Sequence, residues 1–253
     1  MTRRISTIIV ASAAMAVFVL VGCDAMPGRP QQADQPLLPS QVMAFSALYG
    51  QNCAGCHGAE GHLGAARPLN DALYLALVGP DRLRQIVAQG VQGTTMPGFA
   101  AGAGGALTEA QINALVGEML KRWGRPLQAS EGPLPPYDAA GAVDHGSGPG
   151  NPDQGSKVFA EACARCHGPD GNGGDKGGSV VDAAYLALVS DQALRTAVIA
   201  GRTDLGMPDW REDIPGKLLT PQQISDVVAW LAARREPVAG RQVSRMPGAP
   251  SQP

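Results

Sequence analysis

Two short stretches of the chain combine thiol and imidazole side chains at a spacing that suits one particular chemistry. They are Cys53-Ala-Gly-Cys56-His57 and Cys163-Ala-Arg-Cys166-His167. The pattern Cys-x-x-Cys-His is typical of covalent haem c attachment. Its two thiols, one helical turn apart, add to the porphyrin vinyl groups, and the adjacent histidine reaches the iron from one face. The two stretches therefore predict two covalently bound haem c groups, with His57 and His167 as iron ligands.

Other chemistries use the same residue types. A structural zinc ion takes four Cys or His ligands, whereas each stretch offers two thiols and one imidazole. A thioredoxin-like thiol pair sits beside a parallel sheet, and no strand pattern indicates such a sheet. A disulfide in an exported protein is the third alternative. All three stay open, but two copies of the motif, each completed by a histidine, favour haem.

The second iron ligand of each haem is predicted to be a methionine. Met96 and Met207 stand at matching positions after the two motifs, and each precedes a proline. A single methionine is more often a core residue that fills a gap. Two matched methionines in Gly- and Pro-rich loops instead favour a thioether ligand. Such a ligand raises the reduction potential and leaves no open iron position for oxygen or peroxide chemistry.

The motifs belong to a repeated unit. Residues 71–78 return with small changes as residues 182–189, and the Met-Pro and Leu-Thr pairs follow in the same order in both copies. Such internal similarity indicates a tandem duplication. In chain order we expect a domain over residues 41–123, a Gly- and Pro-rich linker over 124–152, a domain over 153–236 and a disordered tail over 237–253.

Each unit is predicted to be an all-α bundle, because apolar residues recur at helical spacing and no alternating strand pattern is present. Thr108 and Thr220 are each followed three residues later by glutamine, the capping-box pattern of a helix start. Gly90 and Gly201 are predicted helix stops. The other predicted N-caps are Ser40 for a helix over 42–49, Asp81 for a helix over 83–89, and Asp191 in the second unit.

The beginning of the chain is typical of an export signal. Arg3 and Arg4 precede residues 5–22, which carry no charge, as in the basic and apolar regions of a signal peptide. A membrane-spanning helix is the alternative. Leu20-Val21-Gly22-Cys23 resembles the lipobox of bacterial lipoproteins, in which the cysteine is acylated. We therefore expect a signal peptide over residues 1–22, a lipid on Cys23 and a flexible tether over 23–40.

Composition narrows the function further. A net charge of −2 at pH 7 lacks the basic excess of a nucleic-acid-binding protein, so no nucleic-acid partner is expected. Aromatic residues make up only 4% of the chain, which leaves little bulk to fill a core. A buried macrocycle in each unit would supply that apolar mass. On the haem interpretation, four of the five cysteines hold haem and Cys23 holds lipid, so no disulfide is expected.

Each unit resembles a class I bacterial cytochrome c, in which a helix enters Cys-x-x-Cys-His, a loop carries the methionine, and a last helix follows. The chain is similar in layout to cytochrome c4 and to the cytochrome c subunits of cbb3-type oxidases. This resemblance implies an electron carrier rather than an enzyme, with transient redox partners on the periplasmic side of the bacterial inner membrane. The alternatives are a catalytic diheme cytochrome, of peroxidase or thiosulfate-dehydrogenase type, and a tethered subunit of a larger respiratory complex.

The second unit departs from this family at the ligand histidine. The family often has a proline whose carbonyl accepts a hydrogen bond from that histidine and tunes its basicity. The stretch Arg67-Pro68-Leu69 suits this role in the first unit. Residues 178–180, the matching stretch, contain no proline. We therefore expect the two haems to differ in potential.

The packing of the terminal helices is the second departure. The second unit has the family's usual pair of a small and a large residue, Gly155 and Trp230. In the first unit we expect the pair to be reversed, with Phe45 facing Gly117.

The surroundings of the haems offer further candidates. The candidate partners of the haem carboxylates are Arg67, Arg202 and Lys176. The repeated tyrosines Tyr74 and Tyr185 are expected to be packing residues.

Overall fold

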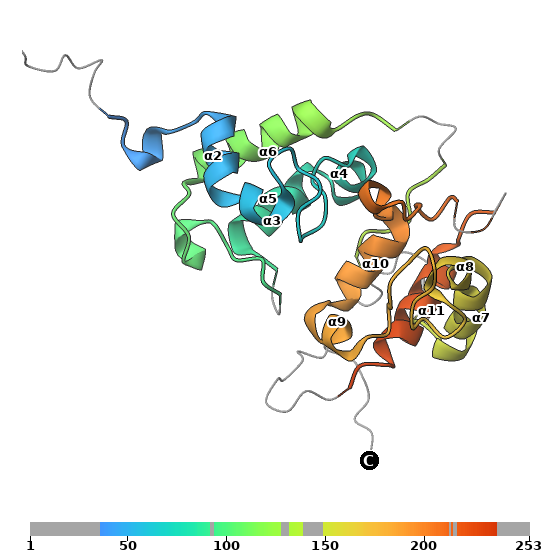
Figure 1. Ribbon diagram of the computed structural model, residues 1–253. Helices are drawn as coiled ribbons and strands as arrows, with labels where there is room; N and C mark the ends of the chain where they lie inside the picture. The colour runs from blue at the N-terminus through green and yellow to red at the C-terminus, as the bar shows by residue number, and fades with distance from the viewer. Residues whose placement is uncertain are drawn as a thin grey trace, which may run out of the picture. The chain divides into compact units, whose positions relative to one another are not determined.

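The computed structural model describes residues 36–91, 94–127, 132–138, 149–212, 214 and 217–236. Within these residues every regular element is a helix, and strand-like pairing is limited to isolated bridges (Figure 1). The predicted all-α fold class is confirmed. Contacts divide the chain into Met1–Gln41, in which the structure describes the short 3-10 helix η2 (Pro39–Gln41), and Val42–Pro253, which holds both repeats.

The same series of helices occurs twice within Val42–Pro253. A helix leads into the first cysteine, a short turn carries the second cysteine and the histidine, two helices follow, and a long helix ends the unit. The first repeat has α2 (Phe45–Asn52), α3 (Ala54–His57), α4 (Ala72–Val78), α5 (Pro80–Gln89), η3 (Ala101–Ala103) and α6 (Glu109–Trp123). The second has α7 (Pro152–Ala162), α8 (Ala164–His167), α9 (Ala183–Leu188), α10 (Asp191–Ala200), η5 (Thr203–Leu205) and α11 (Pro221–Ala232).

The starts of the two long helices are as predicted. Thr108 and Thr220 each accept a hydrogen bond from the backbone of the third helical residue, whose glutamine side chain bonds back to the threonine N–H. Pro221 occupies the first position of α11, where its missing N–H costs no helical hydrogen bond. Both helices bury the apolar residues that recur at helical spacing, namely Ile112, Leu115, Val116 and Met119 in α6, and Ile224, Val227, Val228 and Leu231 in α11.

Three other predicted caps are wrong. Ser40 lies in η2, and α2 begins three residues later than predicted, at Phe45, with no side-chain cap. Asp81 lies within the first turn of α5, because Pro80 already starts that helix after Gly79. Asp191 is likewise the first residue of α10, and the hydroxyl of Ser190 accepts the capping bond from Ala193. The predicted stops at Gly90 and Gly201 are confirmed.

The second repeat is held together by a close crossing of α7 and α11. A Cβ atom added to Gly155 would lie 2.8 Å from the Cβ of Trp230, so only glycine allows the helices to approach this far. Phe159, one turn further along α7, stacks on the Trp230 ring with centroids 4.2 Å apart. The predicted pair of Gly155 and Trp230 is therefore confirmed.

The first repeat does not reverse this pair, and that prediction is wrong. A Cβ atom added to Gly117 would meet nothing within 4 Å, so no large residue faces this glycine. Phe45 instead lies at the end of α6, with its ring 5.6 Å from Trp123 and 5.3 Å from Tyr49, between centroids. An aromatic cluster thus replaces the close helix crossing, because three rings fill the space that a glycine would otherwise close.

Part of the predicted linker is held against both repeats. Arg195 of α10 is buried, and its Nε donates to the carbonyl of Pro136 at 3.0 Å. Gln192 of the same helix donates to the carbonyl of Tyr137 at 2.7 Å. From the first repeat, Arg82 pairs with Asp138 at 3.2 Å. Residues 132–138 therefore have defined contacts, which their Gly- and Pro-rich composition did not indicate.

Several expectations concern the ends of the chain. The predicted signal peptide over 1–22, Cys23 and the tail over 237–253 lie outside the described residues, as does most of the tether over 23–40. Across the described part of the chain, no helix is both long and apolar enough to cross a membrane. The expectations for the two ends therefore stay predictions.

The two helical glycines are expected to respond in opposite ways to alanine. Gly155→Ala should lower the free energy of unfolding by about 1–3 kcal/mol, because its methyl group overpacks the α7–α11 crossing. Gly117→Ala should raise it by about 0.5–1 kcal/mol, because the residue sits in an exposed helix interior with open space around it. Denaturant unfolding of the haem-loaded protein measures both changes in free energy. Equal effects of the two substitutions would contradict a close helix crossing at Gly155 and open space at Gly117.

Candidate functional site

The two Cys-x-x-Cys-His motifs adopt the same backbone. In each repeat the first cysteine extends the preceding helix, with the N–H of Cys53 donating to Tyr49 and that of Cys163 donating to Phe159, both at 2.8 Å. The histidine N–H then donates back to the carbonyl of the first cysteine, at 2.9 Å and 3.0 Å. Both thiols and the imidazole therefore leave one continuous turn, and no disulfide joins any of the four motif cysteines.

His57 is held as a neutral imidazole in which one ring nitrogen is hydrogen-bonded and the other is not. Its Nδ1 lies 2.7 Å from the carbonyl oxygen of Arg67. A carbonyl can only accept, so Nδ1 carries the hydrogen and Nε2 keeps its lone pair. Nε2 is buried and has no hydrogen-bond partner. Burial lowers the pKa of His57 and thereby favours the uncharged form that binds metals. The hydrogen bond to the Arg67 carbonyl acts in the opposite direction.

His167 has the same arrangement in a more open setting. Its Nδ1 donates to the carbonyl of Gly178 at 2.8 Å. A Cβ atom added to the preceding Gly177 would lie 2.9 Å from this Nδ1, so the loop without proline reaches the ring by means of glycine. The missing proline therefore does not remove the acceptor. His57 is 8% exposed, whereas His167 is only partly buried.

The two methionines lie on loops that fold back onto the end of the preceding helix. The N–H of Val91 donates to the carbonyl of Met96 at 3.0 Å, and the N–H of Arg202 donates to that of Met207 at 3.1 Å. A glycine with positive φ stands just before each donor, Gly90 at +73° and Gly201 at +66°. A Cβ atom at either glycine would lie 2.6 Å from the methionine carbonyl.

These two glycines have a role that the sequence analysis missed. Their position as helix stops was recognised, but not their close contact with the methionine backbone. The available signal was the equal spacing from Gly90 to Met96 and from Gly201 to Met207. The sequence does not indicate the acceptor at Gly178 either. Every residue has a backbone carbonyl, so residue types do not show which one accepts the bond.

The residues present fit a haem c group. The buried Nε2 of His57, which lacks a partner, is a nitrogen donor of the kind that haem iron binds. The thiols needed for thioether bonds leave the same turn. Burial, and secondarily the neighbouring Cys56, raise the pKa of Cys53 to about 11, so this side chain is an uncharged thiol at neutral pH. Met96 and Met207, on the loops that contact these glycines, stay the predicted thioether ligands.

The three candidate partners of the haem carboxylates, Arg67, Arg202 and Lys176, differ in their exposure and in their hydrogen bonds within the protein. Arg202 donates to both carboxylate oxygens of Asp204, at 2.9 Å and 3.0 Å. Lys176 is exposed. Arg67 has a completely buried Nη1 without a hydrogen-bond partner, so its guanidinium could hold a haem carboxylate. The tyrosines also differ, since Tyr74 is buried and Tyr185 is 37% exposed.

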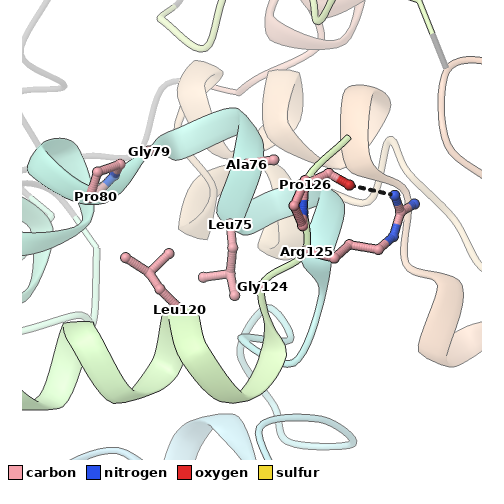
Figure 2. Close-up of a pocket in the computed structure, with 8 residues that line it drawn as sticks. All are labelled: Leu75, Ala76, Gly79, Pro80, Leu120, Gly124, Arg125 and Pro126. Atoms are coloured by element: carbon pink, nitrogen blue, oxygen red, sulfur yellow. Dashed lines mark hydrogen bonds between the residues drawn. The ribbon is translucent and has the colours of Figure 1, made fainter. Parts of the chain in front are cut away.

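A groove of about 340 Å³ lies elsewhere in the first repeat, between α4, the start of α5 and the end of α6 (Figure 2). Arg125 closes one side of it and donates to the carbonyl of Pro126 at 3.3 Å. None of its lining residues is a predicted haem ligand, so this groove is not part of the site. They are Leu75, Ala76, Gly79, Pro80, Leu120, Gly124, Arg125 and Pro126.

Comparison with known families identifies the repeated unit. The family model described as cytochrome c oxidase, cbb3-type, subunit III matches twice, over residues 40–117 and 150–231. The chain belongs to this family. It is therefore a diheme c-type cytochrome with two tandem cytochrome c domains, each an all-α bundle that binds one haem c covalently. This confirms the predicted family, fold class and cofactors.

Individual relatives carry the same description. The chain is 31% identical over 190 residues to the cbb3-type cytochrome c oxidase subunit CcoP of Cereibacter sphaeroides, covering 70% of this chain and 57% of the relative. It is 28% identical over 189 residues to subunit FixP of Sinorhizobium medicae, with the same coverage of each. The chain thus spans little more than half the length of these relatives.

One solved structure is distantly similar, a chain of the Kuenenia stuttgartiensis reducing HAO-like protein complex Kustc0457/Kustc0458. The match has a TM-score of 0.44 and 18% identity, and it covers 76% of this chain and 96% of that chain. A likeness this distant carries no weight for the function.

The methionine loops are expected to fail when their glycines gain a side chain. In Gly201→Ala the new methyl group would press on the Met207 carbonyl, so the far-red iron–thioether band of the ferric protein should fall by about half. Gly90→Ala should do the same at Met96. Gly206→Ala is the matched control, because Gly206 has a φ of +82° but open space around it, and should keep the full band. Equal losses in Gly201→Ala and Gly206→Ala would contradict the close contact.

Proposed function

We propose that this protein passes single electrons through two six-coordinate haems, as a tethered cytochrome subunit that serves a respiratory oxidase. The observation that carries the proposal is the buried, neutral imidazole of His57, whose Nε2 has no partner within the protein. The second repeat provides an equivalent imidazole in His167. We assign the two haem-binding domains to residues 41–123 and 153–236.

Each site residue has one role in this proposal. The thiols of Cys53, Cys56, Cys163 and Cys166 anchor the two haems, which keeps the cofactors in place through many redox cycles. His57 and Met96 hold the first iron, and His167 and Met207 hold the second. When bound, the haem supplies a one-electron couple at each site. The same two protein ligands would stay bound in both oxidation states, which would favour fast electron exchange.

Electron transfer is a better explanation than catalysis. Peroxide or oxygen chemistry needs an open position on the iron, and in this proposal Met96 and Met207 fill that position. Both loops are fixed by the same backbone hydrogen bond to the methionine carbonyl, from Val91 or Arg202. A peroxidase or a thiosulfate-dehydrogenase-like enzyme would have to release one of these methionines. The diheme catalytic cytochrome therefore stays the second candidate.

The likeness to oxidase subunits supports the choice of partner. The relatives are named as subunits of cbb3-type cytochrome c oxidases, and both domains match that family. Docking of redox proteins typically uses small, weak interfaces, so brief contacts with donor and oxidase suit this role. The lipobox-like sequence up to Cys23 supports a lipid anchor on the periplasmic side of the inner membrane.

Purified full-length protein tests the proposal directly. The wild type should carry two covalent haems, and Cys53→Ser with Cys56→Ser should carry one, as should Cys163→Ser with Cys166→Ser. Reduced wild-type protein should be reoxidised by membranes that contain a cbb3-type oxidase, with matching oxygen uptake, because both haems exchange electrons with the oxidase. Each single-haem variant should lose most of this rate. Haem-stained gels, mass spectrometry and an oxygen electrode provide the readouts.

Two outcomes would contradict parts of the proposal. Turnover of peroxide or thiosulfate by the purified protein, with a high-spin ferric signal, would favour the catalytic alternative.

In cells, the wild type should sediment with membranes and Cys23→Ser should not, because the variant has no acylated cysteine. Sedimentation of both would contradict the lipid anchor while leaving the redox role intact.

A further inference from the structure

A hydrogen-bonded connection runs between the two haem sites, and Arg67 is at its centre. Its backbone carbonyl accepts from Nδ1 of His57 at 2.7 Å. Its side-chain Nη2 donates to the carbonyl of Gly201 at 3.2 Å. Gly201 is the glycine that contacts the Met207 backbone in the second repeat. One residue therefore contacts both the histidine of the first site and the methionine loop of the second.

The second half of this connection is rigid. Arg202, which follows Gly201, exchanges two backbone hydrogen bonds with Met207, at 3.0 Å and 3.1 Å. Its side chain is fixed by both carboxylate oxygens of Asp204. The Gly201 carbonyl is thus joined to the Met207 backbone through the next residue and two hydrogen bonds, so we expect the two to move together.

No carboxylate of the described part of the chain pairs with the charge of Arg67. Burial lowers the pKa of its guanidinium, the group forms no ion pair within the described part of the chain, and its Nη1 is buried without a partner. Asp71 lies close enough to act on it electrostatically, but Oδ1 of Asp71 is used to cap α4. The Tyr74 ring, 5.3 Å from the guanidinium carbon, provides a further contact.

We propose that Arg67 is a positioning residue that couples the two haem sites, orienting His57 through its carbonyl and the Met207 loop through its side chain. The inference rests on the proposed axial ligands. A cation this close to the first site also disfavours the extra positive charge of ferric iron, so it should raise the potential of the first haem. Coupling between sites is carried by such contiguous contacts.

The test uses the full-length, haem-loaded protein. Each haem is followed separately by the NMR resonance of its methionine methyl group and by a potentiometric titration. Arg67→Gln should lower the first haem's potential by about tenfold in its reduction equilibrium constant, or 59 mV for one electron. It should also shift the Met207 methyl resonance. Arg67→Lys keeps the charge, so it should preserve the first potential but still shift the Met207 resonance.

A matched control separates this effect from a general loss of arginine. Arg84 is a partly exposed arginine of α5 that pairs with Asp81, and Arg84→Gln should leave both haems unchanged. An unchanged Met207 resonance in a haem-loaded Arg67 variant would overturn the coupling. If Arg67→Gln fails to bind haem, Arg67→Lys decides by the same readout. A wild-type protein without covalent haem would instead contradict the proposed function.

Discussion

The hydrogen bond from each motif histidine to a backbone carbonyl is the interaction on which the haem sites depend. It fixes the orientation of the ring, places the hydrogen on Nδ1 and leaves the lone pair of Nε2 available to bind a metal. In the first repeat the acceptor belongs to Arg67, and in the second to Gly178. The acceptor loop must come within 3 Å of the ring, and in the second repeat Gly177, beside the acceptor, leaves room for this approach.

The two repeats meet the same requirement with different packing. The second closes α7 on α11 through Gly155, while the first fills the equivalent space with the rings of Phe45, Tyr49 and Trp123. What stays constant is the local geometry around the cofactor, namely the cysteine turn, the carbonyl acceptor and the glycine beneath the methionine loop.

The sequence was most informative where chemistry ties function to residue type. Both capping boxes, the apolar faces of the long helices, the family and the two haem groups could be predicted, because each depends on local spacing. Ser40 and Asp81 were misplaced as caps, because α2 begins later without any side-chain cap and Pro80 already starts α5. The packing of Phe45 against Trp123 and the Arg67–Gly201 bond depend on long-range contacts, which no local pattern records.

In the proposed function, each iron has one histidine and one methionine ligand. Near-infrared magnetic circular dichroism of the ferric, full-length protein tests it most directly, because the position of the low-spin charge-transfer band identifies the pair of axial ligands. Both haems should show the histidine–methionine band, with intensity for two haems per chain. A high-spin haem, or a band typical of two nitrogen ligands, in either repeat would contradict it.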